Sequence, residues 1–209
     1  MVPGDENRKA LERVADGIKQ CRQCPLWEGV HNGVPGEGNP HARIMVIGEA
    51  PGKQEDLQGR PFVGRSGKIL DTQLAGIQIR REDIFIANIV RHRPPANRAP
   101  GAGEVVACTP WLELQVRIIH PKILVPLGRY AAGYILGRAG IRFKKVSDIC
   151  GRSFESSPFG FSQVVFPMLH PAATLHNPNT RVKFREDFLA LRGVLDSLGE
   201  EENVEGRIP

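Results

Sequence analysis

The residues best suited to chemistry lie in one glycine-rich stretch, residues 48–64, which reads GEAPGKQEDLQGRPFVG. An apolar run at residues 44–47 leads into it, and the carboxylate of Glu49 follows its first glycine. The same stretch holds the carboxylate of Glu55 and the aromatic ring of Phe62. Open α/β sheets build their sites at the carboxyl edge, where a strand runs into a turn of this kind. We therefore expect a site here, although glycine and proline alone would also fit a plain surface loop.

Two more polar side chains stand at the ends of expected strands. Asn88 closes the strand expected at residues 84–90, and His170 follows the one expected at residues 164–169. In a parallel sheet such ends share one edge, so these residues can face the same crevice as the glycine-rich stretch. Taken singly, Asn88 could bond loop backbone, His170 could cap a strand end, and Phe62 could be a core residue.

Together, the four kinds of side chain suit the breaking of an N-glycosidic bond. An amide offers both a donor and an acceptor to the O4 and N3–H edge of a pyrimidine. A flat ring can stack on a base, a contact worth roughly 1–3 kcal/mol. A histidine can donate to an oxygen that gains charge, and a carboxylate can orient water or stabilise a cationic sugar.

Expected strands and helices alternate along the chain, and these elements must position the residues named above. Such alternation predicts an α/β fold, a three-layer α/β/α sandwich around a mostly parallel four-stranded sheet, formed by one domain over residues 1–209. Residues 91–103, rich in proline and glycine, are expected to be irregular, and residues 199–209 to be a frayed tail. Strands are expected at residues 44–47, 84–90, 123–127 and 164–169, and helices at residues 5–20, 64–79, 104–119, 128–135 and 180–198.

The net charge and the lengths of the apolar runs limit the kinds of partner that the protein can have. The chain has 209 residues, a formal net charge of +5 and a pI of about 9.2, which favours polyanionic partners. It has no apolar run near the roughly 20 residues needed to cross a bilayer, and no apolar core of a signal peptide near residue 1. We expect a cytoplasmic protein with no membrane partner, in which paired cysteines indicate metal or redox chemistry.

Several separate motifs resemble the family 4 uracil-DNA glycosylases, the iron–sulfur branch of that superfamily. The resemblance extends over residues 21–188 and implies an α/β/α enzyme that removes uracil from DNA after flipping the nucleotide out. It also implies a DNA-repair hydrolase that works as a monomer on single- or double-stranded DNA. The shared pieces are GEAPG with EDLQGRPFVGRSG, IANIVR before RPPANRAP, EVVACTPWLELQ, KILVPLG and HPAATLHNP.

The resemblance assigns catalytic roles to two residues. Glu49 matches the acid near the attacking water, and His170 matches the histidine near uracil O2, where negative charge collects as the bond breaks. Pro171 opens a loop that enters the minor groove. Leu175 is our choice for the apolar wedge in the vacated stack, with Thr174 as the alternative.

The remaining matched residues are expected to hold the base. Phe62 matches the ring stacked on uracil, and Asn88 matches the amide that reads its edge. Glu55 stands where a side chain would crowd C5 and so disfavour thymine. Ala50 and Gly52, in the turn after the strand, are expected to contact the base as well.

A metal centre is indicated by Cys21-x-x-Cys24, whose spacing suits zinc, an iron–sulfur cluster or a redox pair. The resemblance implies a 4Fe–4S cluster with two further cysteines. Cys108 fits one of these places, but His92 occupies the other, which is the chain's main departure from the family pattern. We expect His92 to be the fourth ligand, as histidines are in Rieske centres. Cys150 is the alternative fourth ligand. Zinc in place of the cluster, or a lost cluster, is a further alternative.

The histidine at this place is also found in uracil-DNA-binding relatives that become trapped on their product. Those proteins carry a second, reactive histidine in the following loop, which here has none after His92. We therefore expect turnover, with capture of uracil sites without turnover as the alternative and an enzyme of free nucleosides as a third. No lysine suited to Schiff-base chemistry lies in the motifs, so the glycosylase is expected to be monofunctional. Basic residues around both loops are expected to hold phosphates, namely Arg60, Arg65, Lys68, Arg91, Arg93 and Arg98, with His176 and Asn177 meeting backbone.

Overall fold

The computed structural model describes residues 5–175 and 177–205, and its centre is a six-stranded sheet of order β1-β3-β2-β4-β6-β5. The four inner strands are mutually parallel, whereas the two edge strands run antiparallel to their neighbours. The strands are β1 (Glu37–Gly38), β2 (Ile44–Gly48), β3 (Phe85–Asn88), β4 (Ile123–Pro126), β5 (Phe154–Ser156) and β6 (Gln163–Val165).

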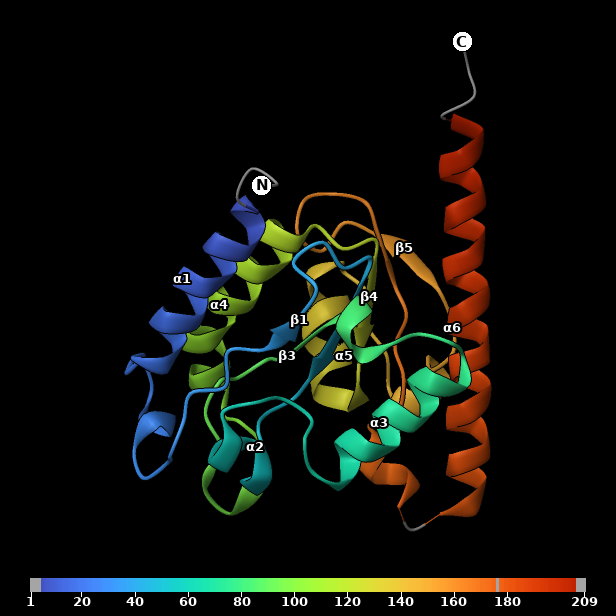
Figure 1. Ribbon diagram of the computed structural model, residues 1–209. Helices are drawn as coiled ribbons and strands as arrows, with labels where there is room; N and C mark the ends of the chain where they lie inside the picture. The colour runs from blue at the N-terminus through green and yellow to red at the C-terminus, as the bar shows by residue number, and fades with distance from the viewer. Residues whose placement is uncertain (1–4, 176, 206–209) are drawn as a thin grey trace.

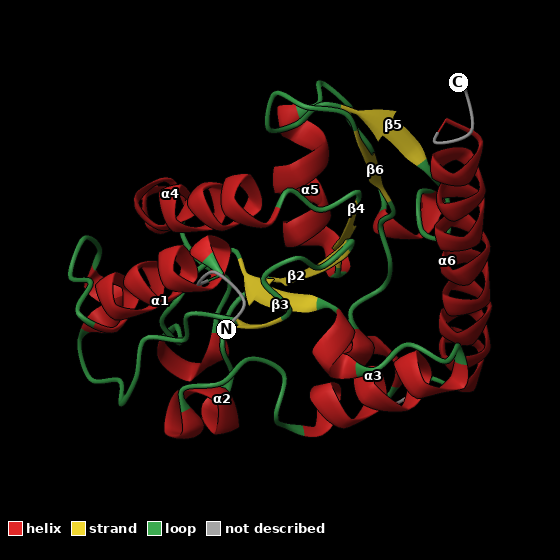
Figure 2. Ribbon diagram, turned by 45° about the horizontal axis from the view of Figure 1, so that its top comes forward, coloured by secondary structure: helices red, strands yellow, loops and turns green. Residues whose placement is uncertain are grey.

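Helices cover both faces of this sheet (Figure 1). Figure 2 shows α1, α4 and α5 on one face and α3 and α6 on the other. A short helix, α2, follows β2, and one-turn 3₁₀ helices η1 (Pro25–Trp27), η3 (Pro95–Asn97) and η5 (Pro171–Thr174) lie in loops. The α-helices are α1 (Glu6–Lys19), α2 (Lys53–Gln58), α3 (Arg65–Gly76), α4 (Ala102–Ile119), α5 (Gly128–Arg138) and α6 (Pro178–Glu205).

The alternation of side chains along β2 shows why the sheet needs two helical layers. Met45 and Ile47 belong to the apolar cluster beneath α1, α4 and α5, whereas Ile44 and Val46 belong to the cluster beneath α3 and α6. All of them are at most 2% exposed. A strand that is apolar on both sides can only be buried on both sides, so the expected α/β/α sandwich is confirmed.

The elements differ from the expected ones mainly at short or edge segments. The sheet has six strands because β1 and β5, with two and three residues, are too short to show a sequence pattern. Helix α2 forms inside the stretch that was expected to be only a turn, and α4 starts at Ala102, within the loop expected to end at residue 103. Strand β6 is shorter than expected, and α6 continues to Glu205, into the segment expected to fray. Residues 206–209 of that tail lie outside the described part.

Within the residues described, none of the helices combines the length and apolar character required to traverse a lipid bilayer.

Candidate functional site

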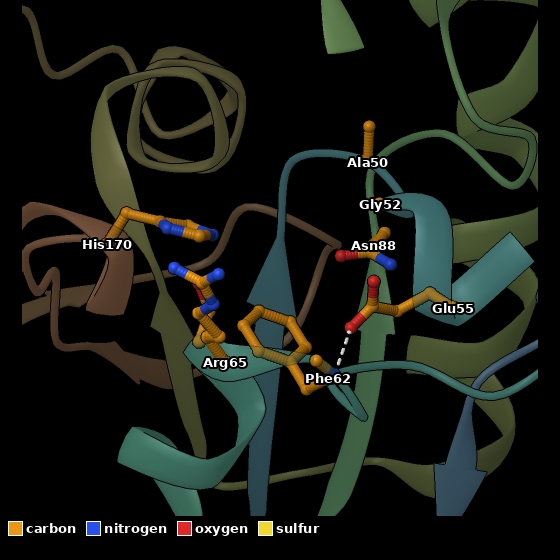
Figure 3. Close-up of a pocket in the computed structure, with 9 residues that line it drawn as sticks. Ala50, Gly52, Glu55, Phe62, Arg65, Asn88 and His170 are labelled. Carbon is orange, nitrogen blue, oxygen red and sulfur yellow. Dashed lines mark hydrogen bonds between the residues drawn. The ribbon is translucent and has the colours of Figure 1, made fainter. Parts of the chain in front are cut away.

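A cavity of about 180 Å³ opens where β2 and β3 end. It is lined by six residues that the sequence predicted, and Figure 3 shows the Phe62 ring between the His170 side and the Asn88–Glu55 side. The structure therefore brings these predicted residues together, while their roles stay predictions. The predicted six are Ala50, Gly52, Glu55, Phe62, Asn88 and His170, and Gly64, Arg65 and Ser66 complete the lining.

The pairing of two parallel strands places the amide in the cavity. Gly48 of β2 lies opposite Asn88 of β3 in the register. A Cβ on Gly48 would overlap Asn88 Oδ1 and come 2.7 Å from the Phe62 ring. Only glycine therefore lets the amide and the ring approach each other over the end of β2.

Asn88 is buried, with 2% of its surface exposed, yet its side-chain oxygen Oδ1 has no hydrogen-bond partner in the described structure. A buried amide oxygen without a partner is costly, by roughly 1–3 kcal/mol, and is rarely left so in a native protein. Its position in the wall of the cavity means that a ligand's N–H can supply the missing partner.

Phe62 is held in an unusual backbone conformation, with φ at 50°. Its carbonyl accepts a hydrogen bond from Arg81 Nη1 at 3.3 Å, and Pro61 O accepts one from Nη2 at 2.5 Å. Arg81 is in turn paired with Glu37 at 2.9 Å and Asp71 at 2.8 Å. No pattern in the sequence indicates this role of Arg81, because it depends on contacts between distant segments.

Glu55 orients the turn that carries the ring. Its Oε1 accepts hydrogen bonds from Val63 N at 2.9 Å and Gly64 N at 2.7 Å, the second drawn in Figure 3. These two bonds use one carboxylate oxygen and fix the side chain against the cavity wall. The position of Glu55 in helix α2 therefore ties the segment after β2 to the start of α3.

His170 presents a neutral ring to the cavity. Burial lowers the pKa of its imidazole, although the charge of Glu55 opposes this shift. Its Nδ1 accepts a hydrogen bond from Ala172 N at 3.2 Å, so in the neutral ring the proton is on Nε2. His170 Nε2 is thus available as a donor.

Glu49 is the one predicted catalytic residue that does not line the described cavity. It lies between Gly48 and Ala50, and its backbone oxygen accepts from Val90 N at 3.1 Å. Burial raises the pKa of its half-buried carboxyl group. A carboxylate whose pKa is raised is a stronger base towards a nearby water.

The structure separates the two candidates for the wedge. Thr174 is 1% exposed and its hydroxyl donates to Pro171 O at 2.7 Å, so the alternative that Thr174 is the wedge is wrong. Leu175, at the end of η5, is partly exposed and stays the predicted wedge. His176 lies outside the described residues.

The predicted basic residues differ in their surroundings, and one of them, Arg93, donates from Nε to Asn97 Oδ1 at 2.7 Å. Arg65 and Lys68 are exposed at the start of α3, and Arg65 also lines the cavity, which the sequence did not predict. Arg60 and Arg98 pair with glutamates, at 2.7 and 2.6 Å. Arg91 is fully buried, so its expected contact with phosphate is wrong.

The three predicted cysteine ligands and His92 gather beside α1 and α4. Burial raises the pKa of the Cys108 thiol to about 11, and the charges of Cys24 and Cys21 act in the same direction, which requires that they lie near it. His92 and Cys21 line one surface depression, and burial lowers the pKa of His92, which favours the neutral ring that binds metals. Gly33 allows this packing, because a Cβ there would stand 3.0 Å from His92 Nε2.

Among the described residues, no three Cys, His, Asp or Glu side chains form a group that could hold a metal ion. The four residues gathered here are three thiols and an imidazole, which are donor types that iron–sulfur clusters use. Cys150 is elsewhere: burial raises its pKa to about 12, and its charged neighbours are Asp187 and Lys183 of α6.

A buried carboxylate links the two regions. Asp56, in α2 beside Glu55, is 3% exposed. It accepts hydrogen bonds from His31 N at 2.8 Å and Asn32 N at 3.1 Å, and it contacts His31 Nδ1 at 3.1 Å. The loop it holds continues into Gly33, next to His92.

A model of the family described as the uracil DNA glycosylase superfamily matches residues 35–192. The chain is 42% identical to a type-4 uracil-DNA glycosylase of Saccharolobus solfataricus, over 90% of this chain and 87% of the relative. It is 44% identical to one of Sulfurisphaera tokodaii, over 88% and 84%, and 41% identical to one of Archaeoglobus fulgidus, over 86% and 90%.

The hydrogen bonds of Asp56 make stability depend on pH in a defined direction. Burial favours the protonated acid, but the bonds from Asn32 and His31 together outweigh it and lower the pKa of Asp56. The ionised Asp56 therefore contributes to the free energy of unfolding above its ordinary pKa of about 3.9. This contribution is lost as the pH falls through the lower pKa of Asp56 in the folded protein. We expect Asp56→Asn to lower the free energy of unfolding at pH 7 by about 1.5–3 kcal/mol.

Urea unfolding at pH 7 and at several values below pH 4 measures this difference, which should shrink as the pH falls. Asp16→Asn is the matched control, since the Asp16 side chain is 68% exposed. A penalty for Asp56→Asn that stayed constant down to pH 2 would contradict the assignment.

Proposed function

Because this chain belongs to the uracil DNA glycosylase superfamily, we propose that its cavity receives a uracil flipped out of DNA and that the enzyme hydrolyses the N-glycosidic bond, leaving an abasic site. The observation that carries this proposal is the unpartnered Asn88 oxygen beside the Phe62 ring. Such a pair offers both a stacking surface and a hydrogen-bonding edge, which is what a single base requires.

Recognition follows from the chemistry of the amide. Asn88 Oδ1 accepts from uracil N3–H, and its NH₂ group donates to O4. Cytosine presents the opposite pattern, an acceptor at N3 and a donor at N4, so it leaves both groups of the amide unsatisfied. Phe62 holds the plane of the base by stacking. Glu55 stands beside C5 and excludes the methyl group of thymine.

Bond breaking depends on two further residues. The neutral His170 ring donates from Nε2 to uracil O2, where negative charge develops as the bond to C1′ lengthens. Glu49, with its raised pKa, orients the water that attacks C1′ and stabilises the cationic sugar. The cavity lining contains no lysine, which favours hydrolysis by water over Schiff-base chemistry.

The surroundings of the cavity suit a nucleic acid. Arg65 and Lys68 are placed to meet phosphates at its rim, and Leu175 to fill the space that the flipped base leaves in a duplex. We propose that the enzyme acts as a monomer, on either single- or double-stranded DNA.

We also propose a 4Fe–4S cluster held by Cys21, Cys24, His92 and Cys108. The support is the donor set, three thiols and a neutral imidazole beside the same two helices. Such a cluster would cross-link the segment after α1, the loop after β3 and helix α4. The four cysteines are free, which agrees with a reducing, cytoplasmic location.

Excision of uracil tests the site. We expect Asn88→Ala and His170→Ala each to lower the rate of uracil release from a uracil-containing oligonucleotide by about 10²–10³-fold, because each removes a hydrogen bond made to the departing base. Asn7→Ala in α1 and His41→Ala in the loop before β2, neither of which lines the cavity, should release uracil at the wild-type rate.

The assay is run with substrate in large excess over enzyme. Near-normal rates in both cavity variants would contradict the site. A wild-type burst of no more than one uracil per protein, or a protein–DNA adduct that survives denaturation, would instead indicate capture without turnover.

Iron content tests the ligand set. His92→Ala should lower the iron bound per chain, because it removes a ligand, whereas Cys150→Ser should leave iron and visible absorbance unchanged, because Cys150 lies against α6. Iron analysis of the purified variants measures both. The reverse pattern would make Cys150 the fourth ligand, and zinc in place of iron in the wild type would contradict the cluster.

A further inference from the structure

Arg91 is a buried charge without a countercharge. It is 0% exposed, and a guanidinium group keeps its charge in proteins. The other buried charged groups in the described chain are matched: Asp56 contacts His31 at 3.1 Å and Asp187 contacts Lys183 at 2.7 Å. An ionised side chain is almost never fully buried unless it is paired.

The polar partners of the Arg91 guanidinium are all neutral. Nη2 donates to Gln115 Oε1 at 2.7 Å, and Nη1 donates to Pro35 O at 3.4 Å. Nε has no partner in the described structure. Within that structure no carboxylate pairs with the group, and its one ionisable neighbour is the thiol of Cys108.

Arg91 is also tied to the ligand region through the chain. It precedes His92, and its backbone N donates to Cys108 Sγ at 3.2 Å. The position of the arginine is thus fixed relative to two of the four donors.

We propose that Arg91 is the buried countercharge of the cluster held by Cys21, Cys24, His92 and Cys108, and that it sets the ease with which the cluster accepts an electron. This inference rests on the cluster proposed above. Three thiolates outweigh the positive charge of an oxidised 4Fe–4S core, so the ligated site is anionic, and reduction makes it more so. A fixed positive charge in a poorly solvated interior stabilises both states, and the reduced state more.

The test uses iron-loaded protein and a reductive titration with dithionite, followed by electron paramagnetic resonance. We expect Arg91→Met and Arg91→Gln to lower the equilibrium constant for one-electron reduction at least tenfold, a shift of about 59 mV towards negative potential. Arg91→Lys keeps the charge and should stay close to wild type. Arg117→Met, an exposed change on α4, is the matched control and should have no effect.

The outcomes separate this inference from the cluster itself. If Arg91→Met and Arg91→Gln keep full iron and an unchanged reduction potential, the role of Arg91 as countercharge is wrong, while the cluster itself is not contradicted. A second outcome would support the countercharge: both neutral variants lose iron but stay folded by circular dichroism, while Arg91→Lys keeps full iron. Charge at residue 91 is then the property that the cluster requires. Loss of iron in Arg91→Lys as well would overturn it. A wild-type protein without iron would contradict the cluster and remove the basis of the inference.

Discussion

The site depends on the absence of a side chain at Gly48. Parallel pairing of β2 with β3 sets Gly48 directly opposite Asn88, and Phe62 folds back over the same point. Any Cβ there would overlap the amide oxygen and press on the ring. Strand pairing thus sets where the Asn88 amide lies. The missing side chain of Gly48 leaves the space in which the amide and the Phe62 ring can line one base-sized cavity.

Two segments around this point are held by charge. Arg81 donates hydrogen bonds to the carbonyl oxygens of Pro61 and Phe62. These bonds hold the backbone of Phe62, which carries the ring, in its left-handed conformation. Asp56 holds the loop at His31 and Asn32 against α2. These contacts link the cavity to the neighbourhood of His92, so the base-binding region and the proposed cluster are built on adjoining parts of one scaffold.

Much of the site could be predicted from the sequence, because Asn88 and His170 stand at strand ends and parallel strand ends share an edge. The α/β/α fold followed from the same alternation of apolar segments. What the sequence concealed depends on tertiary contacts. Arg91 looked like a phosphate ligand beside two other basic residues, and only the structure shows it to be buried, with its guanidinium bonded to Gln115 of α4 and to Pro35. Helix α2 and the role of Arg81 were missed for the same reason.

The most direct measurement of the central claim is uracil release by a Gly48→Ala variant, compared with Gly133→Ala, where a Cβ meets open space. If Gly48 makes the cavity, uracil release by Gly48→Ala should fall at least about 100-fold, while Gly133→Ala keeps the wild-type rate. Circular dichroism and thermal unfolding would show whether the Gly48→Ala protein is still folded. A folded Gly48→Ala protein that releases uracil at the wild-type rate would contradict the account.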